Sequence, residues 1–189
     1  MRGNVAEFVE ADGLEGIKKS IRTIPDFPKK GVMFRDITTL LLDPVAFRRS
    51  IKAMAGHYRE KGIDVIAGAE SRGFIFGAAL AYELGVAFVP IRKPGKLPAK
   101  TRKAEYDMEY GTDSLEVHDD AIRKGQRVLL VDDLLATGGT IRAAAELVKE
   151  LGARLAGLCF LIELSYLNGR EALEGLGADI FSIVRYDSE

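Results

Sequence analysis

The segment from Val128 to Thr140 combines the residue types needed to bind a phosphoryl group. It reads VLLVDDLLATGGT, an apolar run followed by two carboxylates and a turn of small residues. Glycines permit positive φ and a close approach of the backbone, so several N–H groups of such a turn can point toward one anion. A helix that begins at the turn adds the positive end of its dipole. This pattern predicts a phosphomonoester site formed by Ala136, Thr137, Gly138, Gly139 and Thr140.

The two aspartates of this segment leave three roles open. Asp132 and Asp133 stand where a bound 5-phosphate would leave a sugar ring within reach, and ionised carboxylates can accept hydrogen bonds from two ribose hydroxyls. They could instead be Mg²⁺ ligands, or one of them could cap the helix that follows. The common nucleotide motifs do not apply, because the lysine of GxxxxGK[ST] and the spacing of GxGxxG are both missing.

A second concentration of charge lies in residues 92–104. This segment contains six basic residues and no acid, whereas the remainder of the chain is acidic overall. The six are Arg92, Lys93, Lys96, Lys100, Arg102 and Lys103. Positive charge gathered in a segment with glycine and proline predicts a mobile loop that meets a small polyanion. A solvated surface loop without a ligand would have the same composition.

Short apolar runs separated by helical patterns predict how these groups are held. Apolar runs without alternation are typical of strands that are buried on both faces. Such runs span residues 63–69, 86–91, 128–131, 155–162 and 180–184, and helical periodicity covers residues 72–84, 140–151 and 168–173. The alternation predicts an α/β fold with a mostly parallel central sheet flanked by helices. Ligands of such sheets bind beyond the carboxyl ends of the strands.

The N-terminal part of the chain supplies elements of another kind. Apolar residues recur at helical spacing over residues 14–21, which predicts a short amphipathic helix that ends before Pro25. Residues 24–36 are rich in proline and glycine and are expected to form an ordered loop that carries two phenylalanines. Asp43 followed by Pro44 has the pattern of an N-cap and a first helical residue, so a second helix is expected there.

Composition narrows the class of protein. With 189 residues, 47% of them hydrophobic and 29% charged, we expect a single globular domain over residues 1–189. The net charge of −1 argues against a nucleic-acid or membrane partner held by global charge. The single cysteine excludes an intrachain disulfide, and no His/Cys cluster has metal-ligand spacing. Without an apolar stretch of about 20 residues or a signal-peptide pattern, a cytoplasmic location is expected.

The segment VDDLLATGGT resembles the phosphoribosyl pyrophosphate (PRPP) signature of the type I phosphoribosyltransferases. Further segments follow in the order typical of the adenine phosphoribosyltransferases in that family, and the resemblance spans about residue 17 to residue 186. They read PDFPKKGVMFRDIT, AGAESRGFIFG, IRKPGKLP, EYDMEYG and LIEL, starting at residues 25, 67, 91, 105 and 161. The resemblance implies a type I phosphoribosyltransferase fold. It also implies a base-binding hood in residues 1–40 and a flexible catalytic loop in residues 93–112.

The implied reaction transfers the 5-phosphoribosyl group of PRPP to N9 of adenine and gives AMP and pyrophosphate. Mg²⁺ would accompany PRPP, held mainly by substrate oxygens and water rather than by a dedicated set of protein ligands. A homodimer is also implied, and some basic residues would act across its interface. Two other functions stay open, namely a phosphoribosyltransferase for another base and a PRPP-sensing regulator without turnover. Regulators of that kind usually carry a separate basic DNA-binding module, for which this chain leaves little room.

The resemblance places the pyrophosphate at the ends of the first two sheet strands. Arg72 would hold it with both arms of its guanidinium and stabilise the charge of the leaving group, unless it only forms a salt bridge at the helix cap. The peptide between Glu70 and Ser71 is implied to be cis. The remaining residues implied to contact PRPP or AMP are Ser71, Arg92, Lys93, Lys96, Asp132, Asp133, Ala136, Thr137, Gly138, Gly139 and Thr140.

Glu109 in EYDMEYG matches the acid/base glutamate of the family. It would manage the proton at N7 while the purine attacks through N9, and its neighbour Tyr110 would close over the substrate. Closure of the loop would exclude water from an activated sugar that could otherwise be hydrolysed. Apart from the resemblance, an exposed loop glutamate would be the simpler interpretation.

The base needs a flat apolar slot with a few backbone groups to recognise its edge. Phe34 can stack on a purine, Met33 and Arg35 offer main-chain N–H and C=O groups, and Leu164 would close the opposite face. Phe34 could also serve only to anchor its loop. The choice of adenine over hypoxanthine or orotate rests on the resemblance.

Overall fold

A five-stranded parallel sheet forms the centre of the computed structural model, which describes residues 11–108 and 111–188. The strand order is β4-β3-β7-β8-β9, and all four neighbouring pairs are parallel. The strands are β3, Val65–Ala69; β4, Ala87–Ile91; β7, Arg127–Leu135; β8, Arg154–Leu164; and β9, Asp179–Tyr186. The predicted α/β fold with a mostly parallel central sheet is confirmed.

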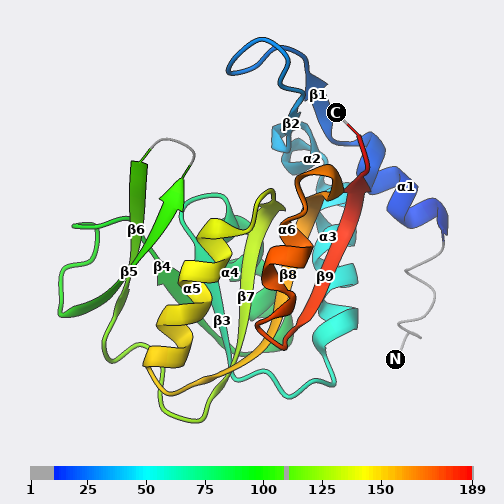
Figure 1. The fold of residues 1–189 in the computed structure, drawn as a ribbon. Helices are drawn as coiled ribbons and strands as arrows, with labels where there is room; N and C mark the ends of the chain where they lie inside the picture. The colour runs from blue at the N-terminus through cyan, green and yellow to red at the C-terminus, as the bar shows by residue number, and fades with distance from the viewer. Residues whose placement is uncertain (1–10, 109–110, 189) are drawn as a thin grey trace, which may run out of the picture.

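Helices cover both faces of this sheet (Figure 1). On one face pack α1, Ala11–Lys19; α3, Pro44–Tyr58; and α4, Gly73–Leu84, and on the other pack α5, Gly139–Glu150, and α6, Gly169–Glu174. Along β7, Leu129 and Val131 join the core on the first face, whereas Val128 and Leu130 join the core on the second. This double burial explains the continuous apolar run. None of the helices in the described part of the chain is long and apolar enough to cross a membrane.

The expected N-cap at Asp43 is confirmed. Its Oδ1 accepts hydrogen bonds from the backbone N–H groups of Val45 and Ala46, at 2.9 and 3.2 Å, and Pro44 occupies the first helical position. These bonds satisfy two of the N–H groups that have no partner within the helix. A short helix, α2, Thr38–Leu42, precedes the cap.

Two short strands lie within residues 1–40, where a hood is predicted; this strand pair, called the hood from here on, stands above the carboxyl edge of the sheet at the top of Figure 1. They are β1, Arg22–Ile24, and β2, Phe34–Asp36, and they pair antiparallel. The prediction of a loop over residues 24–36 is therefore wrong at both ends. Asp36 closes the pair: hydrogen bonds from the backbone N–H of Thr38 and from the Arg22 guanidinium lower its pKa to about 2. An ion pair between the strands thus compensates for their short length.

A second antiparallel pair, here called the ribbon, stands beside α5 at the left of Figure 1. Its strands are β5, Thr101–Met108, and β6, Gly111–His118. The prediction of a loop over residues 93–112 is therefore wrong for residues 101–108 and 111–112. Ala104 and Leu115 are buried in the core that α5 shares, and the Arg102 guanidinium pairs with Asp119 at 2.6 Å. Burial of Ala104 and pairing of both basic side chains, Arg102 with Asp119 and Lys103 with Glu105 at 2.9 Å, stabilise this charged strand.

Candidate active site

The turn between β7 and α5, residues 136–140, is here called the glycine loop. Gly138 has φ +89°, a conformation that is strained for residues with a side chain. Helix α5 starts at the next residue, and no described side chain caps it, so the N–H groups of its first turn are available to an anion. A pocket of about 80 Å³ is lined by Asp132 and residues 134–141. The geometry is that of a small anion site.

Two carboxylates and a guanidinium meet where β7 ends and α4 begins. Asp133 is 3% exposed, and its Oδ2 lies 3.0 Å from Nε of Arg72. The two charges attract, but the pair is not aligned as a hydrogen bond, and this oxygen has no hydrogen-bond donor among the described residues. Asp132 lines the pocket of the glycine loop, and its Oδ1 accepts a hydrogen bond of 2.8 Å from the backbone of Asp133. A ribose hydroxyl would satisfy the unpaired oxygen.

Burial sets the pKa values of Asp132 and Asp133 at this corner, the place where these carboxylates meet Arg72. Burial raises the pKa of the Asp132 carboxyl, and repulsion by Asp133 raises it further. Burial also raises the pKa of Asp133, although the positive charge of Arg72 opposes the shift. The positive charge of Arg72 does not offset the cost of burying both carboxyls, so a hydroxyl donor or a cation would be bound favourably at this corner.

Two glycines that the sequence analysis did not single out let helices approach this corner. A Cβ atom on Gly73 would lie 2.8 Å from the carbonyl oxygen of Val131 and 3.0 Å from Oδ1 of Asp132. A Cβ atom on Gly169 would overlap the carbonyl oxygen of Ala136. Such contacts join residues far apart in the chain, so the local sequence contains no pattern that reveals them.

The ends of β3 and β4 are joined by a carboxylate. Glu70 accepts hydrogen bonds from Nη2 and Nε of Arg92, at 3.1 and 3.2 Å, and from the backbone N–H of Lys93 at 2.8 Å. The peptide between Glu70 and Ser71 is cis, as the resemblance implies. Arg92 therefore fixes the end of β4 to the turn that carries Ser71 and Arg72. Sequence reasoning missed this role of Glu70.

Lys93 connects the end of β4 to the ribbon. Its ammonium group pairs with Asp113 and donates a hydrogen bond of 2.9 Å to the hydroxyl of Tyr106. Burial alone would lower the pKa of Lys93, but these two hydrogen bonds outweigh it and raise the pKa. Lys96, three residues further along, is exposed. Of the two lysines, Lys93 is thus the one held by protein groups.

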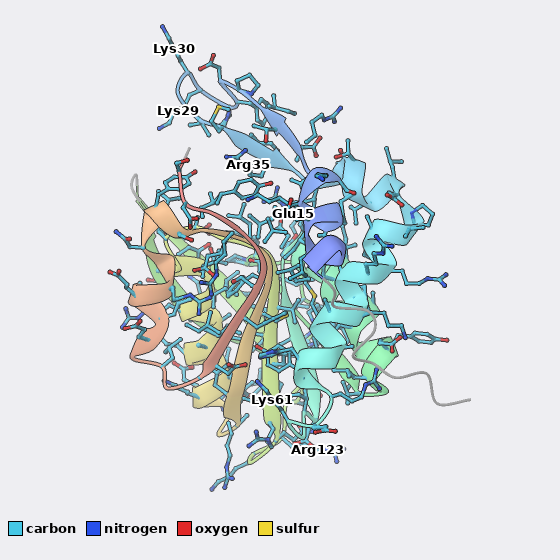
Figure 2. All side chains as sticks on the ribbon, turned by 90° about the vertical axis from the view of Figure 1, so that its right-hand side faces the viewer. Glu15, Lys29, Lys30, Arg35, Lys61 and Arg123 are labelled. Carbon is cyan, nitrogen blue, oxygen red and sulfur yellow. The ribbon has the colours of Figure 1, made fainter. Side chains whose placement is uncertain are left out.

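Phe34 brings the hood to the same corner. Its ring packs edge-on against Phe27, with centroids 5.1 Å apart, and lies 5.9 Å from the guanidinium carbon of Arg72. The neighbouring Arg35 is buried, and its guanidinium stacks on the ring of Tyr186 at 3.9 Å. Figure 2 shows Arg35 where the hood joins the body of the molecule. An aromatic platform therefore stands next to the arginine that contacts Asp133.

The remaining candidates fall into two groups. Met33 is half-buried directly before β2, and Leu164 is buried at the carboxyl end of β8. Glu109 and Tyr110 lie outside the described residues. Apart from these two, the candidates belong to the hood, to the glycine loop, to the last residues of β7 and β8 or to the segments that follow β3 and β4, so they lie at the edge of the sheet where ligands of parallel sheets bind.

Known proteins share both the sequence and the fold. Residues 37–187 match the family described as phosphoribosyl transferase domain. The chain is 56% identical over 172 residues to the adenine phosphoribosyltransferase of Acidobacterium capsulatum, covering 91% of this chain and 94% of that protein. Identity to the enzyme of Thermoanaerobacter pseudethanolicus is 57% over 173 residues, covering 92% and 99%.

Solved structures agree with these relatives. The crystal structure of adenine phosphoribosyltransferase from Thermoanaerobacter pseudethanolicus has a TM-score of 0.88 at 57% identity, covering 92% of this chain and 99% of that one. The enzyme from Saccharomyces cerevisiae, complexed with an imino-altritol bisphosphate and adenine, has a TM-score of 0.87 at 41% identity, covering 93% and 100%. Because both the matched domain and relatives of this identity cover most of its length, the chain belongs to the phosphoribosyltransferase family, among the adenine phosphoribosyltransferases.

Proposed function

We propose that this protein transfers the 5-phosphoribosyl group of Mg-PRPP to N9 of adenine, releasing pyrophosphate and forming AMP for purine salvage. The observation that carries the proposal is the position of the Phe34 ring, 5.9 Å from the Arg72 guanidinium, which itself contacts Asp133. An aromatic platform for a base thus lies beside groups suited to a phosphoribosyl donor. The similarity to enzymes named for adenine supports this choice of base.

The residues around this corner are proposed to bind the three parts of PRPP separately. The glycine loop binds the 5-phosphate through backbone N–H groups and the hydroxyls of Thr137 and Thr140. Asp132 and Asp133 accept hydrogen bonds from the ribose hydroxyls. The groups proposed to contact pyrophosphate are Ser71, Arg72, Arg92, Lys93 and Lys96.

Mg²⁺ is proposed to arrive with PRPP. In the described part of the chain, no three His, Cys, Asp or Glu side chains gather as a metal would require, so the protein offers no carboxylate cage there. The acceptor-rich pair Asp132 and Asp133 suits a substrate complex that carries a cation on its oxygens. When bound, the ion would supply positive charge to the leaving pyrophosphate.

The chemistry proposed for the protein is orientation and charge stabilisation. The bond between C1 of the ribose and the pyrophosphate oxygen breaks with oxocarbenium character, while N9 of adenine forms the new bond to C1. Arg72 stabilises the charge that grows on pyrophosphate. Glu109 manages the proton at N7 of the purine, and Tyr110 covers the substrate. Phe34 stacks on the base between the backbone groups of Met33 and Arg35, with Leu164 on the opposite face.

A turnover assay with four bases tests this function. Pyrophosphate release from Mg-PRPP should require an added base and should be at least about a hundredfold faster with adenine than with hypoxanthine, guanine or orotate. The reaction without base measures hydrolysis and serves as the control. A preference for another base would make this a different phosphoribosyltransferase. Tight PRPP binding without base-dependent turnover would instead support a regulator.

We also propose that the protein is a cytoplasmic homodimer. Several large apolar side chains on α2, α3 and α4 are exposed, which supports a surface that a second copy covers. They are Leu42, Val45, Ile75 and Tyr82. Sedimentation velocity should give twice the mass of one chain at assay concentrations. A monomer with full activity would contradict this proposal.

A further inference from the structure

Helix α6 rests on the glycine loop from outside the corner described above. The carbonyl oxygen of Ala136 faces Gly169 at the start of α6 so closely that a Cβ atom there would overlap it. In the opposite direction, a Cβ atom on Gly138 would lie 3.1 Å from the carbonyl oxygen of Gly169 and 3.3 Å from Cγ of Leu173. Backbone therefore packs on backbone at two points, and a shift of α6 must move the loop.

The residue after Gly169 ties α6 to the sheet. Arg170 donates from Nε and Nη2 to the two carboxylate oxygens of Glu163, at 2.8 and 2.6 Å, and from Nη1 to the carbonyl oxygen of Ile180 at 3.0 Å. Such a two-pronged pair fixes direction as well as distance. Its three bonds join α6 to two neighbouring strands, β8 and β9.

The acceptor of this pair is itself rigid. Glu163 is 3% exposed and pairs in register with Leu135, the last residue of β7 before the glycine loop. Burial alone would raise the pKa of Glu163, but the two hydrogen bonds and the positive charge of Arg170 help to lower it below its usual value. The carboxylate is therefore ionised at neutral pH, and Arg170 supplies its best-aligned charge partner.

We propose that Arg170 and Glu163 are positioning residues for PRPP, because their ion pair holds α6 against the glycine loop and so sets the geometry of the 5-phosphate site. The inference rests on the proposed function of that loop. Neither residue need touch a substrate, since the effect passes through Gly169 and Ala136. Binding of the 5-phosphate should depend on the pair, whereas recognition of adenine in the hood should not.

Arg185 offers a matched control within the same cluster. Its Nε also lies near Glu163, at 3.3 Å from Oε2, but its side chain is 53% exposed and belongs to β9 rather than α6. Loss of the Arg185 side chain would remove one positive charge beside Glu163 but would leave the hydrogen bonds of Arg170 on α6 intact. Any effect shared by Arg170 and Arg185 variants is therefore electrostatic, and any effect confined to Arg170 concerns position.

The decisive variant is the double substitution Glu163→Gln with Arg170→Gln, which removes the bidentate pair without leaving a buried charge unpaired. We expect its KM for PRPP to rise about tenfold or more, while its KM for adenine changes less than about twofold. Arg170→Lys keeps the charge but loses the two-pronged geometry and should fall between this variant and the wild type. Arg185→Gln should match the wild type in both KM values.

Thermal melting and wild-type turnover separate the possible outcomes. A folded double variant with wild-type KM for PRPP would overturn the inference, as would equal rises for PRPP and adenine. If the double variant does not fold, the Arg170→Lys variant replaces it. A KM that rises for PRPP but not for adenine would support the inference, and unchanged or equally raised KM values would overturn it. Failure of the wild type to release pyrophosphate with adenine would instead refute the proposed function.

Discussion

Glu109→Gln should lower turnover by about two to four orders of magnitude, the usual contribution of a positioned acid or base. The amide is nearly isosteric with the carboxyl group but cannot exchange a proton with N7 of the purine. Because Glu109 is proposed to act on the purine and not on PRPP, the affinity for PRPP should stay within about twofold of the wild type. Single-turnover kinetics would measure the first quantity and calorimetric titration with Mg-PRPP the second.

Glu105→Gln is the matched control for this prediction. Glu105 is an exposed glutamate on β5, paired with Lys103 at 2.9 Å, so its substitution makes the same change of charge four residues earlier in the sequence. It should retain wild-type turnover. Equal activity of the Glu109→Gln variant and the wild type would remove Glu109 from the mechanism. A loss of turnover shared by both variants would point to the charge of this segment of the chain rather than to proton transfer.

The parallel core was predictable because its causes are local. Each central strand is covered by helices on both faces, and this double burial leaves the apolar runs that were recognised in the sequence. The N-cap of α3 was equally predictable, since Asp43 and Pro44 act within the first turn of the helix. The ribbon was missed because Arg102 and Lys103 make a strand look like a loop. The partner of Arg102, Asp119, lies 17 residues further along the chain, and Glu105 comes beside Lys103 only because the segment is extended.

The candidate site likewise has features that the local sequence predicts and features that depend on residues far apart in the chain. The order of motifs brought the candidates to the carboxyl ends of neighbouring strands, as the rule for parallel sheets predicts. The partner of each charge was not predictable, because Arg92 meets Glu70 across 22 residues and Arg72 meets Asp133 across the sheet edge. The supporting role of Gly169 was hidden for the same reason. The atoms that a Cβ on Gly169 would meet belong to Ala136 and Leu135, which lie in another part of the chain.

The effect of the glycine loop on binding can be separated from its effect on the stability of the protein by comparing Gly138 with a second glycine of positive φ. Gly138 and Gly152 flank α5 at its two ends, with φ of +89° and +75°. Alanine at either position adopts a left-handed conformation at a cost of about 1–2 kcal/mol. At Gly152 the new Cβ would meet Cγ of Lys124 at 3.1 Å, a flexible side chain that can move away. At Gly138 it would meet the carbonyl oxygen of Gly169, which cannot.

We therefore expect both Gly138→Ala and Gly152→Ala to lose the stability that a left-handed alanine costs, with a larger loss for Gly138→Ala, and only Gly138→Ala to lose activity. Displacement of the loop by the Gly169 carbonyl should raise the KM for PRPP about a hundredfold, in line with the cost of moving a binding group by about 1 Å. The Gly152→Ala variant should keep a KM for PRPP within about twofold of the wild type. Steady-state kinetics with both substrates, alongside urea unfolding, would make the comparison. Equal KM values for PRPP in the two variants would show that the loop does not bind the 5-phosphate, because strain alone would then account for both.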